Sequence, residues 1–355
     1  MQNTPLSAEY ARHGGRVVDF HGWGLPVHFS GIIEEHLHVR SKAGMFDCSH
    51  MGEFVIRGAA GIAALSDLVI GDIVSVPVGR CRYTALLRQD AGVIDDCVAL
   101  KLAEDEVLLV TNAGPLEEVA ALLAENIPGI ENVSEETAKI DIQGPRALEV
   151  LRSVGFGDVQ VLKFWGTMRM NDGIVIARAG YTGELGYELY IPAADAPALW
   201  RAFADYPDVV PCGLGARDTL RSEMGYPLNG DDITTATTPL EAAMNRFIAW
   251  KSNFPGKERL EAQREAGNYQ VLVSLRSPNR RAPRSGYELL HEGRKIGNVT
   301  SGTYGPSVGC GIGLGYVPLE LAQEGTVLQA GPRKHNVIVE APPLYKLGSG
   351  RKPVV

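Results

Sequence analysis

The sequence has no long apolar run and no excess of positive charge, and both absences exclude classes of protein. No stretch of the 355 residues approaches the roughly 20 apolar residues of a membrane-spanning helix. The formal net charge of −8 argues against a protein that mainly binds nucleic acid or an anionic membrane surface. With 45% hydrophobic residues, the composition is typical of a soluble globular protein, and the length predicts two or three domains.

Cysteine is also scarce. The five cysteines, Cys48, Cys81, Cys97, Cys212 and Cys310, are widely separated and form no CxxC pair, a pattern that fits neither a disulfide framework nor a zinc site. It indicates a reducing compartment. Because the N-terminus shows no charged-then-apolar signal pattern, we expect a cytoplasmic protein, or one of an organelle matrix if a leader peptide has been removed.

Motifs for metals and dinucleotides are absent as well. Six of the eight histidines lie in the first fifty residues, but no H-E-x-x-H or Cys/His pairing occurs, so we expect no metal site. His50 is the histidine most suited to line a pocket. The run GLGARD, residues 213–218, lacks the third glycine of a dinucleotide fingerprint. It still predicts a helix whose first turn carries Arg217, either as an anion site or as an ordinary capped helix.

The most informative stretch that is present runs from Arg80 to Asn112. Residues 80–87, 93–102 and 106–111 predict a three-strand meander with turn residues between them. Side chains alternate along a strand, so Asp95 and Asp96 face opposite sides, and both sides are apolar. Burying an unpaired carboxylate costs several kcal/mol. Each acid therefore needs a partner, such as a nearby Arg or backbone N–H, or has a chemical use.

Two further regions frame this meander. Predicted helices at 59–70 and 116–126 flank the strands and indicate an α+β unit between residues 51 and 137. From Tyr269 onward, short β-type runs separated by turn residues predict a small barrel or a sandwich. The run GCGIGLG, residues 309–315, has glycine at every second place and predicts a strand that is closely packed on one face.

A second candidate acid lies in ARAGYTGELGYELYI, residues 177–191. Its glycines lead into a predicted strand on which Glu188 shares a face with Tyr190. An acid among tyrosines, beside glycines that let a ligand come close, is a candidate binding residue. An ordinary glycine-rich hairpin is the alternative.

Many longer phrases carry a resemblance to a known family. They are VDFHGWGLPVHF (18–29), IIEEHLHVRSKAGMFDCSHMGEF (32–54), GVIDDCV (92–98), IQGPRALEVL (142–151), GYTGELGYEL (180–189), GLGARDTLR (213–221), FPGKERL (254–260) and VTSGTYGPSVG (299–309). In this order, and over nearly the whole chain, they resemble the T-proteins of the glycine cleavage system, which are tetrahydrofolate-dependent aminomethyltransferases.

The resemblance implies an α+β fold, a three-domain cloverleaf. Its first domain would combine residues 1–50 with 138–250, its second would be an inserted ferredoxin-like α+β domain at 51–137, and its third a C-terminal β-barrel at 265–355. The implied reaction moves the one-carbon unit of an aminomethyl group, carried on the lipoyl arm of a partner H-protein, to tetrahydrofolate and releases ammonia. A monomer that docks this partner transiently is expected.

The resemblance also implies roles for individual residues. Asp96 matches the catalytic carboxylate, Glu188 a residue that reads the pterin ring, and Arg217 a substrate-binding arginine. The remaining implied cofactor-binding positions are Tyr83, Met51, Asn112 and Tyr345, and no metal is implied.

Some positions depart from the family pattern, among them Gly24, Leu25 and Asn229. They leave open a folate-dependent demethylase of the same fold that acts on a methylthio or methoxy compound. A folate-binding accessory protein without turnover is the third reading, but that class typically lacks the IDD and GLGARD runs found here.

Overall fold

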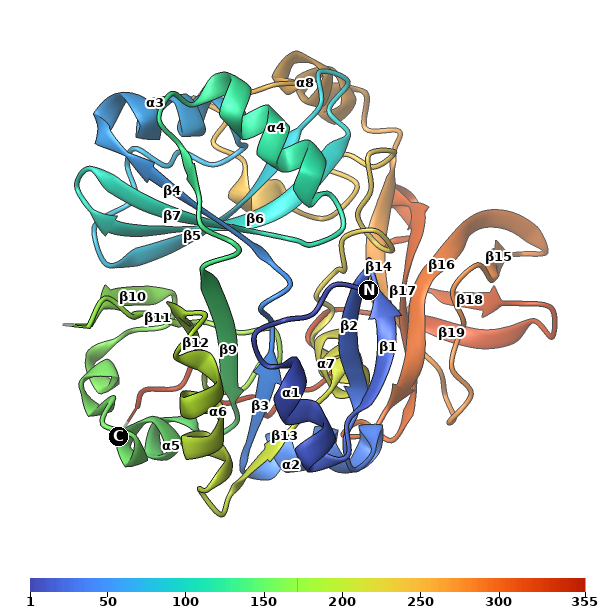
Figure 1. The fold of residues 1–355 in the computed structure, drawn as a ribbon. Coiled ribbons are helices and arrows are strands. Elements are labelled where there is room, and N and C mark those ends of the chain that lie inside the picture. The colour runs from blue at the N-terminus through green and yellow to red at the C-terminus, as the bar shows by residue number, and fades with distance from the viewer. Residues whose placement is uncertain (171, 355) are drawn as a thin grey trace.

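The computed structural model describes residues 1–170 and 172–354, which form three lobes around a central space (Figure 1). Two lobes share one sheet and the third is a barrel. The α+β class and the C-terminal barrel are both confirmed. None of the helices in the described ranges has the length and apolar character needed to cross a membrane.

Within the described residues the large sheet has eleven strands and is mixed. Its order is β13 (Val209–Pro211), β3 (Ala43–Asp47), β9 (Thr137–Gln143), β12 (Gly186–Pro192), β11 (Val175–Arg178), β10 (Gly166–Arg169), β5 (Arg80–Leu87), β6 (Val93–Ala103), β7 (Glu106–Thr111), β4 (Gly52–Arg57) and β8 (Glu131–Asn132). β13 and β3 are parallel, and the other neighbours are antiparallel. The pair Gly166–Arg80 joins β10 to β5, so the two halves of the sheet meet at a narrow seam.

The helices lie on the faces of this sheet or around the central space. They are α1 (Ser7–Tyr10), α2 (Ile32–Ser41), α3 (Gly58–Leu68), α4 (Leu116–Asn126), α5 (Ala147–Ser153), α6 (Ala196–Ala204), α7 (Leu214–Met224) and α8 (Lys257–Ala266). A separate hairpin consists of β1 (Arg16–Phe20) and β2 (Trp23–His28). The helices predicted at 59–70 and 116–126 are confirmed as α3 and α4.

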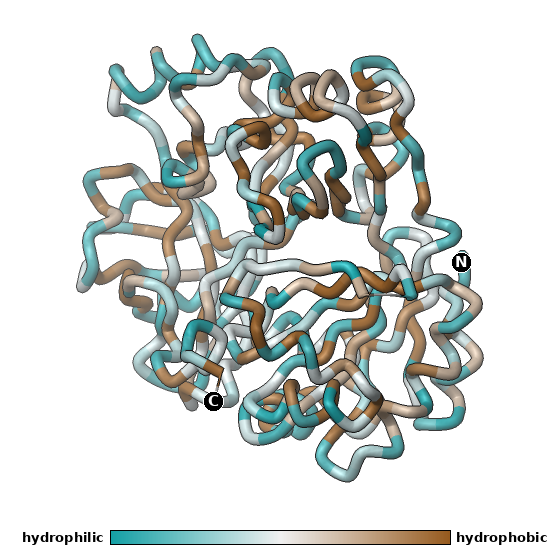
Figure 2. Tube along the Cα trace, turned by 90° about the vertical axis from the view of Figure 1, so that its left-hand side faces the viewer, coloured by the Kyte–Doolittle hydropathy of each residue, from teal (hydrophilic) through white to brown (hydrophobic). Residues whose placement is uncertain are grey.

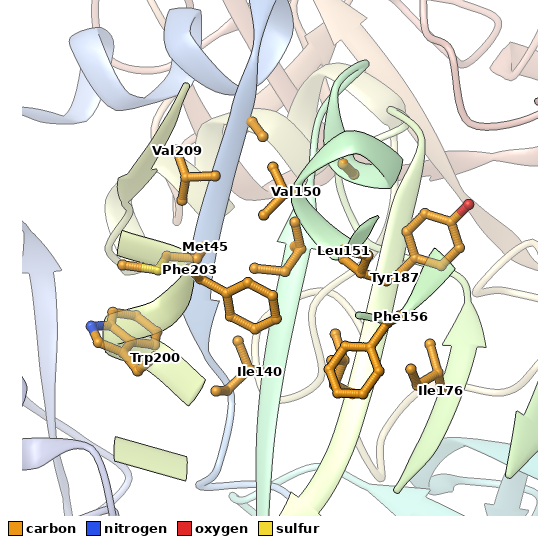
Figure 3. Close-up of a cluster of buried hydrophobic side chains, with 14 of the residues drawn as sticks. Met45, Ile140, Val150, Leu151, Phe156, Ile176, Tyr187, Trp200, Phe203 and Val209 are labelled. Carbon is orange, nitrogen blue, oxygen red and sulfur yellow. The ribbon is translucent and has the colours of Figure 1, made fainter. Parts of the chain in front are cut away.

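The first lobe has its core between the β3, β9 and β12 half of the sheet and the helices α5 and α6 (Figure 3). Trp200 and Phe203 are three residues apart on α6, so they lie on one side of the helix and are fully buried against the sheet. Tyr187 of β12 is buried in the same core. This packing fixes β9 and β12, the two strands that carry several polar side chains discussed below.

The second lobe contains the predicted meander. β5, β6 and β7 pair antiparallel in chain order, and α3 and α4 cover one face of these strands (Figure 1). β4 pairs antiparallel with both β7 and β8. β7 and β8 are therefore parallel, with β4 between them, and α4 joins them as the crossover helix of a split βαβ unit. Ferredoxin-like domains contain such a unit. Here the first two strands of the meander, β5 and β6, extend its sheet.

The segment after α7 crosses to the meander. Apolar residues between 233 and 260, including Leu240, Met244 and Phe254, pack with Leu87 and Val93 in one buried cluster. The backbone N–H of Val93 donates to the carbonyl of Thr237. This crossing brings residues 225–247 close to β6. The division of the chain into domains stays a prediction.

The third lobe is a closed antiparallel barrel of six strands in the part of the chain that the structure describes. They are β14 (Gln270–Arg276), β17 (Cys310–Pro318), β16 (Arg294–Gly305), β15 (Glu288–His291), β18 (Val327–Ala330) and β19 (His335–Glu340) in order around the barrel. A Cβ atom at Gly311 would lie 2.1 Å from the carbonyl oxygen of Arg281. The predicted closely packed face is confirmed for Gly311, Gly313 and Gly315, whereas Gly309 precedes the strand and has open space at its Cβ position.

The hydropathy of the trace follows this arrangement. In Figure 2 hydrophobic residues run along the strands, and hydrophilic residues concentrate in the outer loops and turns. Polar residues that lie inside, around the central space, are therefore exceptions to the pattern. They are the ones that need a physical explanation.

Candidate active site

A cavity of about 1450 Å³ occupies the centre of the molecule, where the three lobes meet. The barrel, the meander, α7 and the loop after it all contribute to its wall. Six of the residues predicted from sequence line it: Met51, Tyr83, Asp96, Asn112, Glu188 and Arg217. His50, considered as a pocket residue, lines it too.

Asp96 enters the cavity from the middle of β6. Its Oδ2 accepts a hydrogen bond of 2.8 Å from the hydroxyl of Tyr83 on β5, and its Oδ1 accepts one of 3.1 Å from the side-chain amide of Asn112 after β7. Ala85 lies opposite Asp96 in the β5–β6 register, so Tyr83, two residues away on the same face, reaches it diagonally. The meander geometry thus places two donors on one carboxylate.

Asp95 points to the other side of β6 and is fully buried. It accepts hydrogen bonds from the backbone N–H of Asn112 at 2.9 Å and from its side-chain amide at 2.7 Å. Asp95 therefore fixes the residue that also contacts Asp96. The expected backbone N–H partner is therefore found for Asp95. Among the described residues, neither acid forms an ion pair with Arg or Lys, so the expectation of an arginine partner is wrong.

The pKa values of both acids are raised. Burial is the main cause for each, and the proximity of the two carboxylates adds to it for Asp95. The hydrogen bonds from Tyr83 and Asn112 act in the opposite direction on the pKa of Asp96. A carboxyl group in a cavity whose pKa is raised by burial is a candidate general acid or base.

A second polar group forms the opposite side of the cavity, on β9, β12 and α7. Glu188 of β12 lies directly opposite Asp141 of β9, and two carboxylates in such a cross-strand pair repel each other. Lys139, two residues from Asp141, resolves this conflict. Its Nζ donates to Asp141 Oδ1 at 2.7 Å and lies 3.6 Å from Glu188 Oε1.

Arg217 and Tyr190 complete this group. Arg217, in the first turn of α7, donates to Asp141 Oδ2 at 3.0 Å, and its guanidinium lies 4.9 Å from the ring centroid of Tyr181. The hydroxyl of Tyr190 donates to Glu188 Oε2 at 2.8 Å, which confirms that Glu188 and Tyr190 share a face. A continuous row of alternating charges thus runs from Glu188 through Lys139 and Asp141 to Arg217.

The electrostatics of this row differ from those of the two acids on β6. Burial by itself would lower the pKa of Lys139, but Asp141 and Glu188 outweigh it and the pKa is raised. Burial likewise would raise the pKa of Asp141, but Lys139 and Arg217 hold it below its usual value. Burial, together with these two cations, lowers the pKa of His50 to about 3. The row is therefore charged and internally compensated.

Two models of known families match the chain. One, described as the GCVT N-terminal domain, matches residues 6–252, and another, described as the glycine cleavage T-protein C-terminal barrel domain, matches residues 270–346. An aminomethyltransferase of Halalkalibacterium halodurans is 41% identical over 98% of this chain and 99% of its own length. One of Bacillus subtilis is 38% identical over 98% and 99%. The chain belongs to the glycine cleavage T-protein family.

A solved structure agrees with this membership. The crystal structure of the glycine cleavage system aminomethyltransferase T from Bartonella henselae superposes with a TM-score of 0.93 at 32% identity and covers 98% of this chain and 99% of that one. The match of full-length relatives shows that this T-protein family member is an aminomethyltransferase of the glycine cleavage system.

One residue predicted for the site in this T-protein family member lies elsewhere. Tyr345 does not line the cavity. Its backbone N–H donates to the carbonyl of Glu223, and the guanidinium of Arg40 lies 4.0 Å from the centroid of its ring. Tyr345 therefore ties the C-terminal segment to α2 and α7, and its part in cofactor binding stays a prediction.

Sequence reasoning missed two residues that line the cavity of this T-protein family member, Lys139 and Asn229, and it missed Asp141, which bonds to Lys139 and Arg217. Lys139 and Asp141 carried a signal, because two opposite charges two residues apart in a strand share one face. Asn229, noted only as a departure from the family pattern, lines the cavity, and its side-chain amide lies near enough to Asp96 to lower the pKa of that acid.

Proposed function

We propose that the chain transfers the one-carbon unit of an aminomethyl group, carried as a thioether on the dihydrolipoyl arm of an H-protein, to tetrahydrofolate. Two carbon–nitrogen bonds to the folate form, and the carbon–sulfur and carbon–nitrogen bonds of the aminomethyl group break. The two N–H protons of the folate pass to the sulfur and to the leaving ammonia. The products are 5,10-methylenetetrahydrofolate, ammonium and the dihydrolipoyl arm.

The observation that carries this proposal is the setting of Asp96. A carboxyl group in a cavity, with a raised pKa and two hydrogen-bond donors that fix its orientation, is suited to accept and relay a proton. It can also hold the folate nitrogen so that its lone pair faces the reacting carbon. Asp96 is therefore proposed as the catalytic residue, with Tyr83 and Asn112 as the residues that position it.

The charged row on the opposite wall supports the binding of a folate. A carboxylate accepts two parallel N–H donors, so Glu188 would bind the 2-amino group and N3 of the pterin. Arg217 would meet an anionic part of the folate, since its planar guanidinium suits a carboxylate. Met51 supplies an adaptable apolar contact in the cavity wall.

The partner and location follow from the family and are proposed with the reaction. The lipoyl arm of an H-protein must enter the cavity for transfer to occur, and a transient complex with a monomeric enzyme suffices for that. The chain's cysteines are unbridged and buried in the described structure, and the relatives named above are bacterial, which supports a cytoplasmic location.

A coupled assay tests the reaction. Aminomethylated, lipoylated H-protein and tetrahydrofolate are supplied, and ammonium and 5,10-methylenetetrahydrofolate are measured. The wild-type chain is expected to form both in equal amounts. If a methylthio or methoxy compound instead yields methyltetrahydrofolate and the H-protein yields no ammonium, the proposal is wrong and the chain is a demethylase.

Asp96→Asn tests the catalytic residue. The substitution preserves shape and removes the ability to take up a proton, so turnover should fall by about a hundredfold or more while reduced folate still binds. Asp90→Asn, in the exposed turn of the same β5–β6 hairpin, is the matched control. Unchanged turnover in Asp96→Asn would remove Asp96 from the mechanism.

A further inference from the structure

Lys139 is a buried cation in the cavity wall with spare hydrogen-bonding capacity. Its side chain is 1% exposed and lies on β9, where burial of an unpaired ammonium would cost several kcal/mol. Asp141 satisfies one of its three N–H donors, at 2.7 Å. Glu188 at 3.6 Å neutralises charge but is too distant for a good hydrogen bond.

The position of Lys139 relative to Glu188 determines which part of a ligand the two remaining N–H donors of Lys139 would meet. Both residues line the cavity, and they lie diagonally across the β9–β12 pair, with Asp141 directly opposite Glu188 and Lys139 opposite Tyr190. A ligand edge that meets the carboxylate of Glu188 therefore has an ammonium next to it. The wall presents two acceptor oxygens followed by one donor.

A pterin ring carries the complementary sequence of groups along one edge. The 2-amino group and N3–H are donors, and the adjacent 4-oxo oxygen is an acceptor. Resting on the proposed folate binding at Glu188, we propose that Lys139 is a specificity-determining residue that donates a hydrogen bond to the 4-oxo oxygen of the pterin and so rejects 4-amino pteridines. Asp141 positions Lys139 for this contact and at the same time holds Arg217.

The discrimination follows from the chemistry of the edge. Replacement of the 4-oxo group by an amino group places a donor against the ammonium donors of Lys139, and neither can then accept. A hydrogen bond that involves a charged group is worth about 1.5–3 kcal/mol, which corresponds to a ratio of affinities between about tenfold and a hundredfold or more.

Titration calorimetry with three stable ligands tests the inference. 5-Formyltetrahydrofolate reports whether a reduced folate binds at all. Folic acid and aminopterin differ in the 4-oxo or 4-amino group and, with it, in the proton on N3. The ratio of their dissociation constants therefore reports the contacts at both positions, and the change of that ratio in a Lys139 variant isolates the 4-position. The wild-type chain is expected to bind folic acid at least about tenfold more tightly than aminopterin.

Variants then assign the preference to Lys139. Lys139→Met removes the ammonium donor and leaves Asp141 its ion pair with Arg217, so the ratio should fall by about tenfold or more. The double variant Lys139→Met/Asp141→Leu, which also removes the carboxylate that holds Lys139, should lower the ratio by the same factor. Lys101→Met is the control, because Lys101 is also a buried lysine on a strand of this sheet but does not line the cavity. Lys101→Met should keep the wild-type ratio. An equal fall of the ratio in Lys101→Met would show that the effect of Lys139→Met comes from a general loss of stability.

The outcomes distinguish this inference from the proposed function. If the wild-type chain binds none of the three ligands, folate binding itself fails. If it binds 5-formyltetrahydrofolate but does not prefer folic acid over aminopterin, or if either Lys139 variant keeps the wild-type ratio, the role of Lys139 is refuted and the proposed function stands.

Discussion

The two walls of the cavity bury charged side chains in opposite ways. On β6, Asp95 and Asp96 have hydrogen-bond donors but no cationic partner in the part of the chain that the structure describes, and their pKa values are raised. On β9, each charge of the row has an oppositely charged neighbour, and the pKa of Asp141 is lowered. The acids of one wall have raised pKa values, and the charges of the other wall compensate one another.

This difference separates two tasks that one site must perform. A group that accepts a proton during the reaction must not be locked into its charged form by a cation. A group that recognises a ligand by its donors and acceptors must keep a fixed charge and orientation. The placement of the two kinds of group on different strands allows each to be tuned by its own neighbours.

The largest expected effect comes from breaking the compensated wall. Asp141→Ala leaves Lys139 and Arg217 without their shared carboxylate, and removal of one partner from a buried pair costs roughly 3–5 kcal/mol in the free energy of unfolding. Urea unfolding measures this loss. Arg169→Ala, which breaks an exposed pair with Glu106, should cost less than about 1 kcal/mol.

A double variant sharpens that result. Lys139→Met/Asp141→Leu replaces the buried pair by apolar side chains of similar size, so it should cost less than Asp141→Ala alone. Equal losses in the two variants would show that the row does not act as a compensated set of charges.

An intermediate effect is expected on the other wall from Tyr83→Phe. The hydroxyl of Tyr83 donates to Asp96 and lowers its pKa, so its removal raises that pKa further and leaves less carboxylate at a given pH. The acid limb of the kcat/KM profile should move to higher pH. Turnover at neutral pH should fall by roughly tenfold or more, the scale of a hydrogen bond to a charged group.

Tyr10→Phe is the control for this prediction. It removes another buried Tyr–Asp hydrogen bond, to Asp47, that does not line the cavity. Its pH profile should match that of the wild type. A shift of the same size in both variants would mean that the profile reports general stability and not the ionisation of Asp96.

The smallest effect concerns His50, which lies near the cations of the compensated wall. Burial lowers its pKa to about 3, whereas an unfolded histidine titrates near pH 6.5. As the pH falls between these values, the unfolded chain takes up a proton that the folded chain does not, so the free energy of unfolding falls. The slope from this group is at most about 1.4 kcal/mol per pH unit.

His50→Phe should remove that slope. Unfolding by urea at several pH values between about 6.5 and 4 measures it. His291→Phe, on β15 and outside the cavity, controls for the loss of one histidine. An unchanged slope in His50→Phe would contradict the origin assigned here.

The sequence alone supported much of the fold because the signals were local. Alternation and turn residues predicted the meander, and the position of Arg217 in the first turn of α7 followed from the two glycines before it. The face shared by Glu188 and Tyr190 followed from strand geometry. The family resemblance supplied the rest of the site residues, and all but Tyr345 line the cavity.

The charged row could not be predicted in the same way. The pairing of β9 with β12, about 45 residues apart in sequence, sets Glu188 opposite Asp141, and no local pattern fixes that register. Without the register, Lys139 reads as one more charged residue in a strand. The position of Tyr345 could not be predicted for the same reason, because it depends on long-range contacts with Arg40 and Glu223.

The central cavity has a consequence for how the molecule opens. Its wall includes Phe20 near the N-terminus, Asp96 in the second lobe, and Glu340 and Arg351 near the C-terminus, so no lobe can unfold without dismantling it. A ligand present at a hundred times its dissociation constant adds about 2.7 kcal/mol to the cost of any such opening. Hydrogen exchange in strands far from the ligand, in the barrel as well as in the large sheet, should slow together when the cavity is filled.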